Sequence, residues 1–205
     1  MNSMADKYPN FEALARDERA GIDFSIQARS ALPAFAIVAP HGGGIEPGTS
    51  EIADAIAAED LSFYMFEGLK PAGNADLHIT STRFDEPLCL TLIRRSEIVL
   101  TIHGEESDTG DEIVFIGGLD DRLRRRVGTA LRARDFITRK HPDPKLQGLE
   151  PENLCNRGRS GKGVQLELSL GARKRMFRSL TRKGRRFRTA RFNAFVEAIR
   201  EVAGN

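Results

Sequence analysis

Cysteine is scarce in this 205-residue chain, and long apolar runs are absent. The two cysteines, Cys89 and Cys155, lie far apart, which excludes a disulfide framework and suits a reducing cytoplasm. No run approaches the roughly 18 apolar residues that span a membrane. Residues 1–19 also lack the basic-then-apolar pattern of a secretory signal. We therefore expect a cytoplasmic protein with no membrane partner.

Acidic residues are missing from one long stretch, Arg173–Arg191, which holds ten lysines and arginines. The net charge of +2 hides this asymmetry, because residues 1–121 carry a net charge of −14 and residues 122–205 one of +16. Such a run attracts nucleic acid, an anionic polymer or the acidic half of another copy, or it forms the solvated face of a helix. We expect a basic helical C-terminal segment over residues 173–205.

The remaining composition is that of an ordinary globular protein, with 40% hydrophobic and 29% charged residues. The length favours one domain over residues 1–205. Strand and helix patterns alternate, which predicts an α/β fold: an open, mixed and mostly parallel sheet with helices on both faces. Strands are expected over 21–26, 34–39, 61–68, 98–102, 113–118 and 163–169. Helices are expected near 10–14 (capped by Asn10), from Thr49 or Ser50 to about 59, over 87–95 and 122–134, and through the basic segment to 202.

A histidine and a carboxylate emerge together from the second of these strands. The motif Pro40-His41-Gly42-Gly43-Gly44-Ile45-Glu46 directly follows the apolar run Ala36–Val38. Glycines have no side chains to obstruct a tight turn, so the backbone can fold His41 and Glu46 towards one point. The alternative is a phosphate-cradling glycine loop, although the lysine of a P-loop and the spacing of a dinucleotide fingerprint are both missing.

His103 closes another apolar run, Ile98–Ile102, in the same way. Two imidazoles and a glutamate are a typical ligand set of a catalytic zinc ion, with the fourth position left for water. Taken alone, His103 would more often be a core histidine satisfied by hydrogen bonds. Together with His41 and Glu46 it predicts metal-assisted hydrolysis.

Glu167 is the fourth residue near a predicted strand end. The alternation of Val164, Leu166 and Leu168 places it on the opposite face of its strand. A carboxylate in a strand is costly unless it has a function or a partner. The alternatives are a salt bridge to an arginine and a general base that takes a proton from water and later returns it. In a parallel sheet the carboxyl ends of the strands gather ligands, so all four residues are expected at one edge.

Polar segments elsewhere supply candidates for holding substrate. His78 is a competing third metal ligand, but its polar segment, which includes Arg83, better suits substrate binding or support of the metal ligands. Asn156 and Arg157 lie in a glycine-rich loop, and the planar fork of an arginine binds carboxylates. Cys155 has no evident base nearby, and His141 precedes a proline in a loop expected at the surface.

These motifs together resemble the phage-type poly-γ-glutamate hydrolase family. The resemblance rests on separated segments in the expected order: Tyr8-Pro9-Asn10-Phe11, Pro40–Thr49, Leu77–Thr82, Phe84–Pro87, His103-Gly104, Asn156-Arg157 and Gly163–Ser169. It implies an open α/β sheet like that of the zinc carboxypeptidases. It also implies one Zn²⁺ held by His41, Glu46 and His103, with Glu167 as the base. Hydrolysis of γ-glutamyl amide bonds would follow, with Arg157 meeting a carboxylate of an anionic polymer or acidic peptide-like substrate.

Two other functions stay open at this level. A different small acyl-amino acid or γ-glutamyl amide would use the same catalytic residues. A nucleic-acid-binding accessory protein would use the basic segment to hold phosphates, because arginines do not distinguish polyglutamate from DNA by charge alone. Phage-derived protein made in the cytoplasm would be released by lysis.

Overall fold

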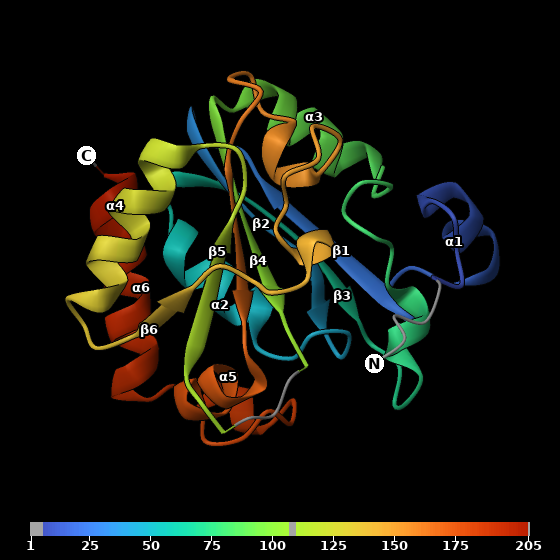
Figure 1. The fold of residues 1–205 in the computed structure, drawn as a ribbon. Coiled ribbons are helices and arrows are strands. Elements are labelled where there is room, and N and C mark those ends of the chain that lie inside the picture. The colour runs from blue at the N-terminus through green and yellow to red at the C-terminus, as the bar shows by residue number, and fades with distance from the viewer. Residues whose placement is uncertain (1–5, 107–109, 205) are drawn as a thin grey trace.

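The structure is a computed structural model that describes residues 6–106 and 110–204, over which strands and helices alternate (Figure 1). The α-helices are α1 (Phe11–Asp17), α2 (Thr49–Ala57), α3 (Pro87–Arg95), α4 (Asp121–Arg132), α5 (Leu170–Met176) and α6 (Ala190–Ala203). The strands are β1 (Phe24–Arg29), β2 (Leu32–Gly43), β3 (Leu61–Gly68), β4 (Ile98–Gly104), β5 (Ile113–Gly117), β6 (Ile137–Arg139) and β7 (Val164–Leu168). Short 3-10 helices are η1 (Asn74–Leu77), η2 (Pro144–Leu146), η3 (Leu154–Asn156) and η4 (Gly184–Arg186).

The strands form one sheet in the order β1-β3-β2-β4-β7-β5-β6. The central pairs β3–β2, β2–β4 and β4–β7 are parallel, as is β5–β6. The pairs β1–β3 and β5–β7 are antiparallel. The mixed, mostly parallel sheet predicted from the sequence is therefore confirmed.

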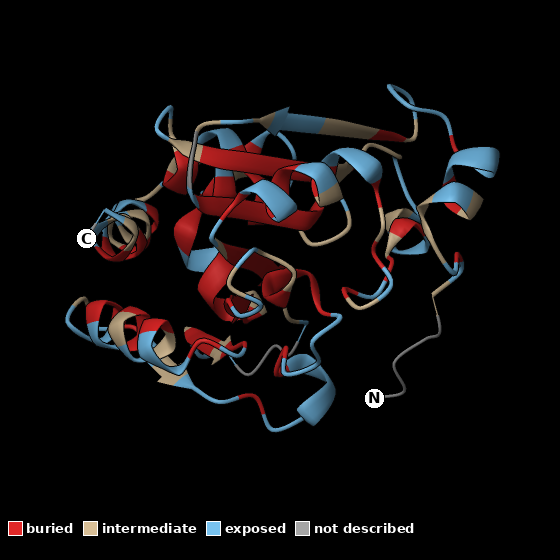
Figure 2. Ribbon diagram, turned by 90° about the horizontal axis from the view of Figure 1, so that it is seen from above, coloured by how far each residue is buried: buried red, intermediate tan, exposed pale blue. Residues whose placement is uncertain are grey.

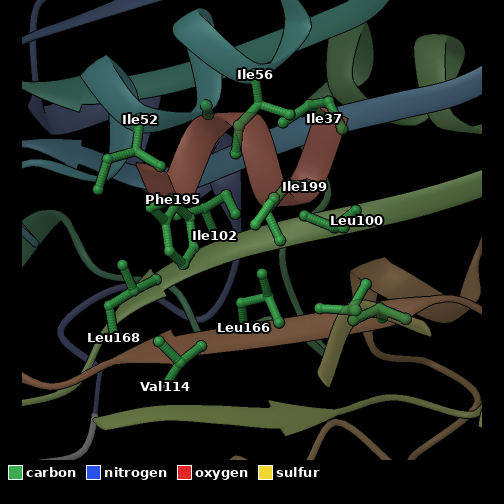
Figure 3. Close-up of a cluster of buried hydrophobic side chains, with 14 of the residues drawn as sticks. Ile37, Ile52, Ile56, Leu100, Ile102, Val114, Leu166, Leu168, Phe195 and Ile199 are labelled. Carbon is green, nitrogen blue, oxygen red and sulfur yellow. The ribbon is translucent and has the colours of Figure 1, made fainter. Parts of the chain in front are cut away.

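Side chains on the two faces of the sheet belong to separate hydrophobic clusters. On one face, Ile37, Leu100 and Leu166 pack with residues of α2, α4 and α6 (Figure 3). On the other face, Val38 and Val99 pack with residues of α1 and α3. Each fully buried side chain of this size stabilises the fold by about 1.5–3 kcal/mol. Helices thus cover both faces, and the central strands between them are buried, whereas the edge strands β1 and β6 are partly exposed (Figure 2).

The parallel neighbours β2, β4 and β7 end at the same edge of the sheet. Each carries a polar side chain close to its last residue: His41 in β2, His103 in β4 and Glu167 in β7. Because the hydrophobic clusters fix the register of these strands, they also fix the relative height of the three side chains.

Several predicted boundaries are wrong in informative ways. Strand β2 continues through His41 to Gly43, whereas an end at Ala39 was predicted. Helix α2 has Gly48 as its N-cap, and no side chain caps it, because Thr49 Oγ1 instead donates to the Glu46 carbonyl oxygen at 2.9 Å. Strand β6 lies in a segment for which the sequence predicted no strand.

The basic segment is also less helical than expected. The stretch between α5 and α6 contains only the short helix η4. An antiparallel bridge between Phe177 and Arg188 joins the two ends of this stretch. Within the described residues, no helix has the length and apolar character that crossing a bilayer would require.

Candidate metal centre

A tight turn after β2 brings Glu46 back beside His41. The Glu46 backbone N–H donates to the His41 carbonyl oxygen at 2.8 Å, and the Gly44 N–H donates to the Gly68 carbonyl oxygen at 2.9 Å. Gly43 has a φ of 67°, and a Cβ there would lie 2.5 Å from the Gly68 carbonyl oxygen. Only glycine combines this left-handed conformation with such a close backbone approach. The glycine run therefore has a geometric purpose.

Three side chains meet at this edge with their coordinating atoms facing one another. His41 Nδ1 lies 3.0 Å from Glu46 Oε1 and 3.2 Å from His103 Nδ1. His103 Nδ1 lies 3.7 Å from Glu46 Oε2. Both histidines are buried, and Glu46 is nearly so. The structure thus brings together the three residues for which the sequence suggested a shared ligand role.

Neighbouring groups fix which ring nitrogens carry protons. His41 Nε2 faces the Ile79 carbonyl oxygen at 2.9 Å, so Nε2 is the donor and Nδ1 keeps its lone pair. His103 Nε2 faces the Ser81 hydroxyl at 3.4 Å, and this hydroxyl can accept the Nε2 proton when His103 takes the same arrangement. Two nitrogen lone pairs and the Glu46 carboxylate then point at one place. Such atoms repel one another unless a proton or a cation lies between them.

Burial and mutual charge effects shift the pKa values of all three residues in the cluster. Burial would lower the pKa of His41, but the Glu46 carboxylate outweighs it and raises that pKa above its ordinary value. Burial would raise the pKa of Glu46, but His41 and His103 together lower it to about 2. The pKa of His103 falls to about 3, mainly because its ring is buried. A proton shared by His41 and Glu46 is therefore what a bound cation would displace.

The donor set fits a zinc ion. Two donors of a tetrahedral zinc site, each about 2.0–2.1 Å from the metal, lie about 3.3 Å apart. The observed spacings of 3.0, 3.2 and 3.7 Å surround that value. Two imidazoles and one carboxylate also leave one position open for a reacting molecule, as catalytic zinc sites do. Glu46 is held in place for this role because its Oε2 accepts from the Gly104 N–H at 2.8 Å.

His78 lies against the same cluster and is the alternative third ligand. Its ring centroid is 4.0 Å from that of His41, and one of its nitrogens lies within 4.8 Å of ligand atoms on His41 and Glu46. His78 Nδ1 bonds to Asp6 Oδ1 at 2.7 Å, which orients the ring and leaves its other nitrogen available. His103 Nδ1 lies 3.2 Å from His41 Nδ1 and 3.7 Å from Glu46 Oε2, and its strand pairs it with Glu167. We therefore take His103 as the third ligand, with the His78 ring packed against His41.

Asp6 is a residue at this site that sequence reasoning missed. Its buried carboxylate accepts from His78, from the Thr80 N–H at 2.8 Å and from Arg83 Nη2 at 2.5 Å. Burial would raise the pKa of Asp6, but these hydrogen bonds hold it well below its usual range. Asp6 therefore joins His78 and Arg83 into one charged group. No motif signals it, because it precedes His78 by 72 residues and stands alone in the N-terminal segment.

Glu167 lies on the strand beside the ligands. The β4–β7 register pairs it directly with His103. Since Leu166 and Leu168 belong to the cluster on one face, Glu167 and His103 share the other face. Glu167 is buried and accepts from Gln165 Nε2 at 2.9 Å, and within the described ranges it forms no ion pair, so the salt-bridge alternative does not hold.

The pKa of Glu167 is raised well above its ordinary value. Burial is the main cause, and the nearby charges of Glu46 and Glu105 add to it. The opposing effects of Arg173 and Gln165 are smaller. Glu167 is thus a carboxyl group that holds a proton when no cation is bound, and a cation in the ligand cluster would favour its ionised form.

Arg157 and Arg83, two further residues predicted to bind substrate, differ in their exposure and in their partners. Arg157 is partly buried, and its Nη1 donates to the Phe84 carbonyl oxygen at 2.9 Å. The Phe84 ring in turn packs against His41, with 6.2 Å between ring centroids. Arg157 is therefore linked to His41 through Phe84, and its guanidinium keeps further N–H donors. Arg83 is half exposed and oriented by Asp6.

The assignment of Asn156 to substrate binding needs correction. Its buried Oδ1 accepts from the backbone N–H groups of Leu119 and Gly163, and its Nδ2 donates to the carbonyl oxygens of Gly148 and Glu150. These four bonds use the whole capacity of the amide, so Asn156 holds the loops together.

Cys155 and His141 are buried as well. Burial raises the pKa of the Cys155 thiol, which suits a structural residue and not a nucleophile. His141 was expected at the surface, but its ring packs on Phe115 and its Nδ1 accepts from the Asp143 N–H at 3.0 Å.

Much of the basic run is structural and not a free surface. Arg173 and Arg185 are buried. Arg185 pairs with Glu51 at 2.6 Å, and Arg191 pairs with Glu112 at 2.6 Å. The interpretation of the whole run as a solvated helix face is therefore wrong.

The chain is similar to several known proteins. A family model described as poly-gamma-glutamate hydrolase matches residues 8–198. The SPbeta prophage-derived UPF0714 protein YoqZ of Bacillus subtilis (strain 168) is 38% identical over 88% of this chain, which spans 65% of that protein's length. A bacteriophage poly-gamma-glutamate hydrolase structure superposes with a TM-score of 0.93 at 34% identity, covering 98% of this chain and 97% of that one. A zinc-free apo structure of YndL gives a TM-score of 0.91 at 35% identity, covering 98% of both chains.

Proposed function

Because the chain belongs to the poly-gamma-glutamate hydrolase family, we propose that it is a zinc-dependent hydrolase that cleaves γ-glutamyl amide bonds in poly-γ-glutamate. The observation that carries the proposal is the convergence of the lone pairs of His41, His103 and Glu46 beside the buried carboxyl group of Glu167. That arrangement has the parts of a hydrolytic centre and leaves one metal position open.

His41, Glu46 and His103 would hold one Zn²⁺, which supplies Lewis-acid chemistry by polarising the scissile carbonyl and making water more acidic. Glu167 accepts a proton from the attacking water as the new C–O bond forms. It then delivers that proton to the γ-amide nitrogen as the C–N bond breaks. The Gln165 side-chain amide donates a hydrogen bond to Glu167 Oε1, which orients the carboxyl group for both transfers.

The polyanionic substrate calls for cations around the centre. Asp6 orients both Arg83 and His78, and the His78 ring packs against His41 at one side of the metal position. Arg157 is linked to the cluster through its hydrogen bond to the carbonyl oxygen of Phe84, whose ring packs against His41. We assign these three side chains to the binding of substrate carboxylates and carbonyls, with arginine forks suited to bidentate contacts.

The test is metal analysis of the purified protein, followed by incubation with poly-γ-glutamate with and without a chelator. We expect about one zinc per chain, and chain cleavage that the chelator stops and zinc restores. Glu167→Gln should lower kcat by at least about 100-fold while the bound zinc stays near the wild-type level. Full activity of Glu167→Gln, or cleavage that persists without metal, would contradict the proposal.

A further inference from the structure

Arg173 is among the largest fully buried side chains of the protein. It lies in α5, the helix that begins directly after β7. A guanidinium withdrawn from water must find hydrogen-bond acceptors, because an unpaired buried charge is very costly. Arg173 Nε donates to the Leu168 carbonyl oxygen at 3.3 Å, Nη1 to that of Pro47 at 3.1 Å, and Nη2 to that of Glu105 at 2.9 Å.

These three acceptors come from three separate segments of the chain. Pro47 directly follows Glu46, Leu168 directly follows Glu167, and Glu105 comes two residues after His103. One planar group thus connects the backbone next to two candidate metal ligands and the candidate base. An exposed carboxylate, Glu106, also accepts from Nη2 at 3.2 Å.

The backbone of β4 is shaped to admit this guanidinium. A Cβ on Gly104 would lie 2.7 Å from Arg173 Cζ, so only glycine permits the planar group to lie against the strand end. Gly104 also donates its N–H to Glu46 Oε2. The ends of the turn after β2, of β4 and of β7 are therefore in contact with one side chain.

We propose that Arg173 is a positioning residue that sets the spacing of Glu46, His103 and Glu167 around the metal position. Its partners are three backbone carbonyl oxygens and Glu106, so it would act through the backbone beside the ligands and not as a ligand itself. The inference rests on the proposed function only for the identity of the metal site, because the contacts of Arg173 exist without it. A planar guanidinium has donors in fixed directions and can hold three carbonyl oxygens at set positions, whereas a lysine ammonium cannot bridge three separated carbonyls.

The experiment loads wild type, Arg173→Met and Arg173→Lys with Co²⁺ alone and records the visible absorption of the bound ion together with its dissociation constant. We expect both variants to bind Co²⁺ at least about 10-fold more weakly and with a changed spectrum. Arg173→Lys keeps the charge and serves if Arg173→Met does not fold.

Arg185→Met is the matched control, because Arg185 is also buried but bonds to Glu51 and the Leu180 carbonyl oxygen. It should lose thermal stability with a wild-type Co²⁺ spectrum and affinity. A wild-type spectrum and affinity in Arg173→Lys would overturn the inference, as would equal changes in Arg185→Met. Failure of the wild-type protein to bind any divalent ion would overturn the proposed function instead.

A separate observation concerns a groove between α4 and β6, which lie beside each other in Figure 1. The groove has a volume of about 310 Å³. Its lining includes five basic residues and one carboxylate, Asp121: the basic residues are Arg124, Arg125, Arg132, Arg139 and Lys140. Ile116 of β5 also lines it and pairs with Leu166 of β7, and both side chains pack in the cluster under α4. His103 and Glu167 point to the other face, so the groove and the metal centre lie on different faces of the sheet.

Three of the five basic residues in this groove have no acidic partner among the described residues. Across the described parts of the chain, Arg125, Arg139 and Lys140 form no ion pair. Arg132 is braced by the hydroxyl groups of Thr138 and Thr129, and Arg124 pairs with Asp121. The Arg173–Arg191 run also holds cations that form no ion pair within the described residues, among them Arg182, Lys183 and Arg186. Those lie on the exposed loop before α6, whereas the cations of the groove line one hollow.

We infer that this groove binds a stretch of poly-γ-glutamate and retains long chains near the enzyme. The inference rests on the proposed function for the choice of polymer. Carboxylate groups along a flexible chain match the charge of Arg125, Arg139 and Lys140, and the two arginine forks suit bidentate contacts. Because the groove and the metal centre lie on different faces of the sheet, the groove acts only on chains long enough to pass around the sheet and reach both.

The test compares Arg125→Gln/Arg139→Gln/Lys140→Gln with Arg182→Gln/Lys183→Gln/Arg186→Gln, which removes the same charge from the exposed loop before α6. Both are made in the Glu167→Gln protein, and binding of poly-γ-glutamate and of a DNA duplex is measured at low salt. We expect the groove variant to bind the polymer about 10-fold more weakly and the control less than 2-fold. Equal effects, no effect, or loss of DNA binding alone would overturn the inference; absence of cleavage by the active enzyme would count against the proposed function only.

Discussion

Individual residues at the metal centre owe their chemistry to burial. His103, His41 and Glu46 are close enough that each changes the proton affinity of the others, and burial together with the charges of Glu46 and Glu105 raises the pKa of Glu167. The proton on Nε2 of His41 is fixed by one carbonyl oxygen, that of Ile79. Neutral rings with outward-facing lone pairs are what a zinc site requires.

The low pKa of His103 predicts how the metal-free protein responds to acid. Its pKa is about 3 in the folded chain and 6.5 ordinarily, so between those values the unfolded chain binds the extra proton. Stability should therefore fall as pH drops from 6.5 to 4.5, by about 2 kcal/mol from this group. Urea unfolding of chelator-treated wild type and His103→Asn measures this. Parallel pH profiles for the two proteins would contradict the assignment.

Asp6 offers a second test at this scale. In Asp6→Asn the charge that orients Arg83 and His78 is lost, so we expect KM for poly-γ-glutamate to rise about 10-fold. The bound zinc should stay near one per chain, because Asp6 contacts no metal ligand by hydrogen bond. Steady-state kinetics and metal analysis measure both. Glu12→Gln, an exposed acid of α1, is the control, and an equal KM change there would refute the role of Asp6.

At the scale of elements, the sequence predicts periodic segments well and close approaches poorly. Helix α3 and strand β3 have the predicted bounds because their apolar spacing and the Pro87 helix start are local signals. The extension of β2 through His41 depends on pairing with β3 across Gly42 and Gly43, which no local pattern encodes.

Gly43 gives the sharpest prediction about an element. In Gly43→Ala the left-handed φ and the collision with the Gly68 carbonyl oxygen add, so we expect a loss of about 3 kcal/mol or more in unfolding free energy and weaker zinc binding. Gly21 has a φ of 79° but open space around it, so Gly21→Ala should cost only about 1 kcal/mol. Chemical denaturation compares the two variants, and similar losses would show that the close approach is unimportant.

At the scale of the whole molecule, the strand order brings together residues that are far apart in sequence. His41, His103 and Glu167 come from three adjacent parallel strands, which the rule that ligands gather at carboxyl ends anticipates. The partners Asp6, Ser81, Gln165 and Arg173 were not anticipated, because their roles depend on loop paths and on burial that no motif expresses. The likeness to zinc carboxypeptidases stays a prediction.

The most direct test is the position of the metal itself. A crystal of the zinc-loaded protein, measured on both sides of the zinc absorption edge, should show one anomalous peak about 2.0–2.2 Å from His41 Nδ1, His103 Nδ1 and a Glu46 carboxylate oxygen. The Glu167 carboxyl group should face the open side of that peak. A peak held by His78 in place of His103, or no peak at this edge of the sheet, would contradict the proposed centre.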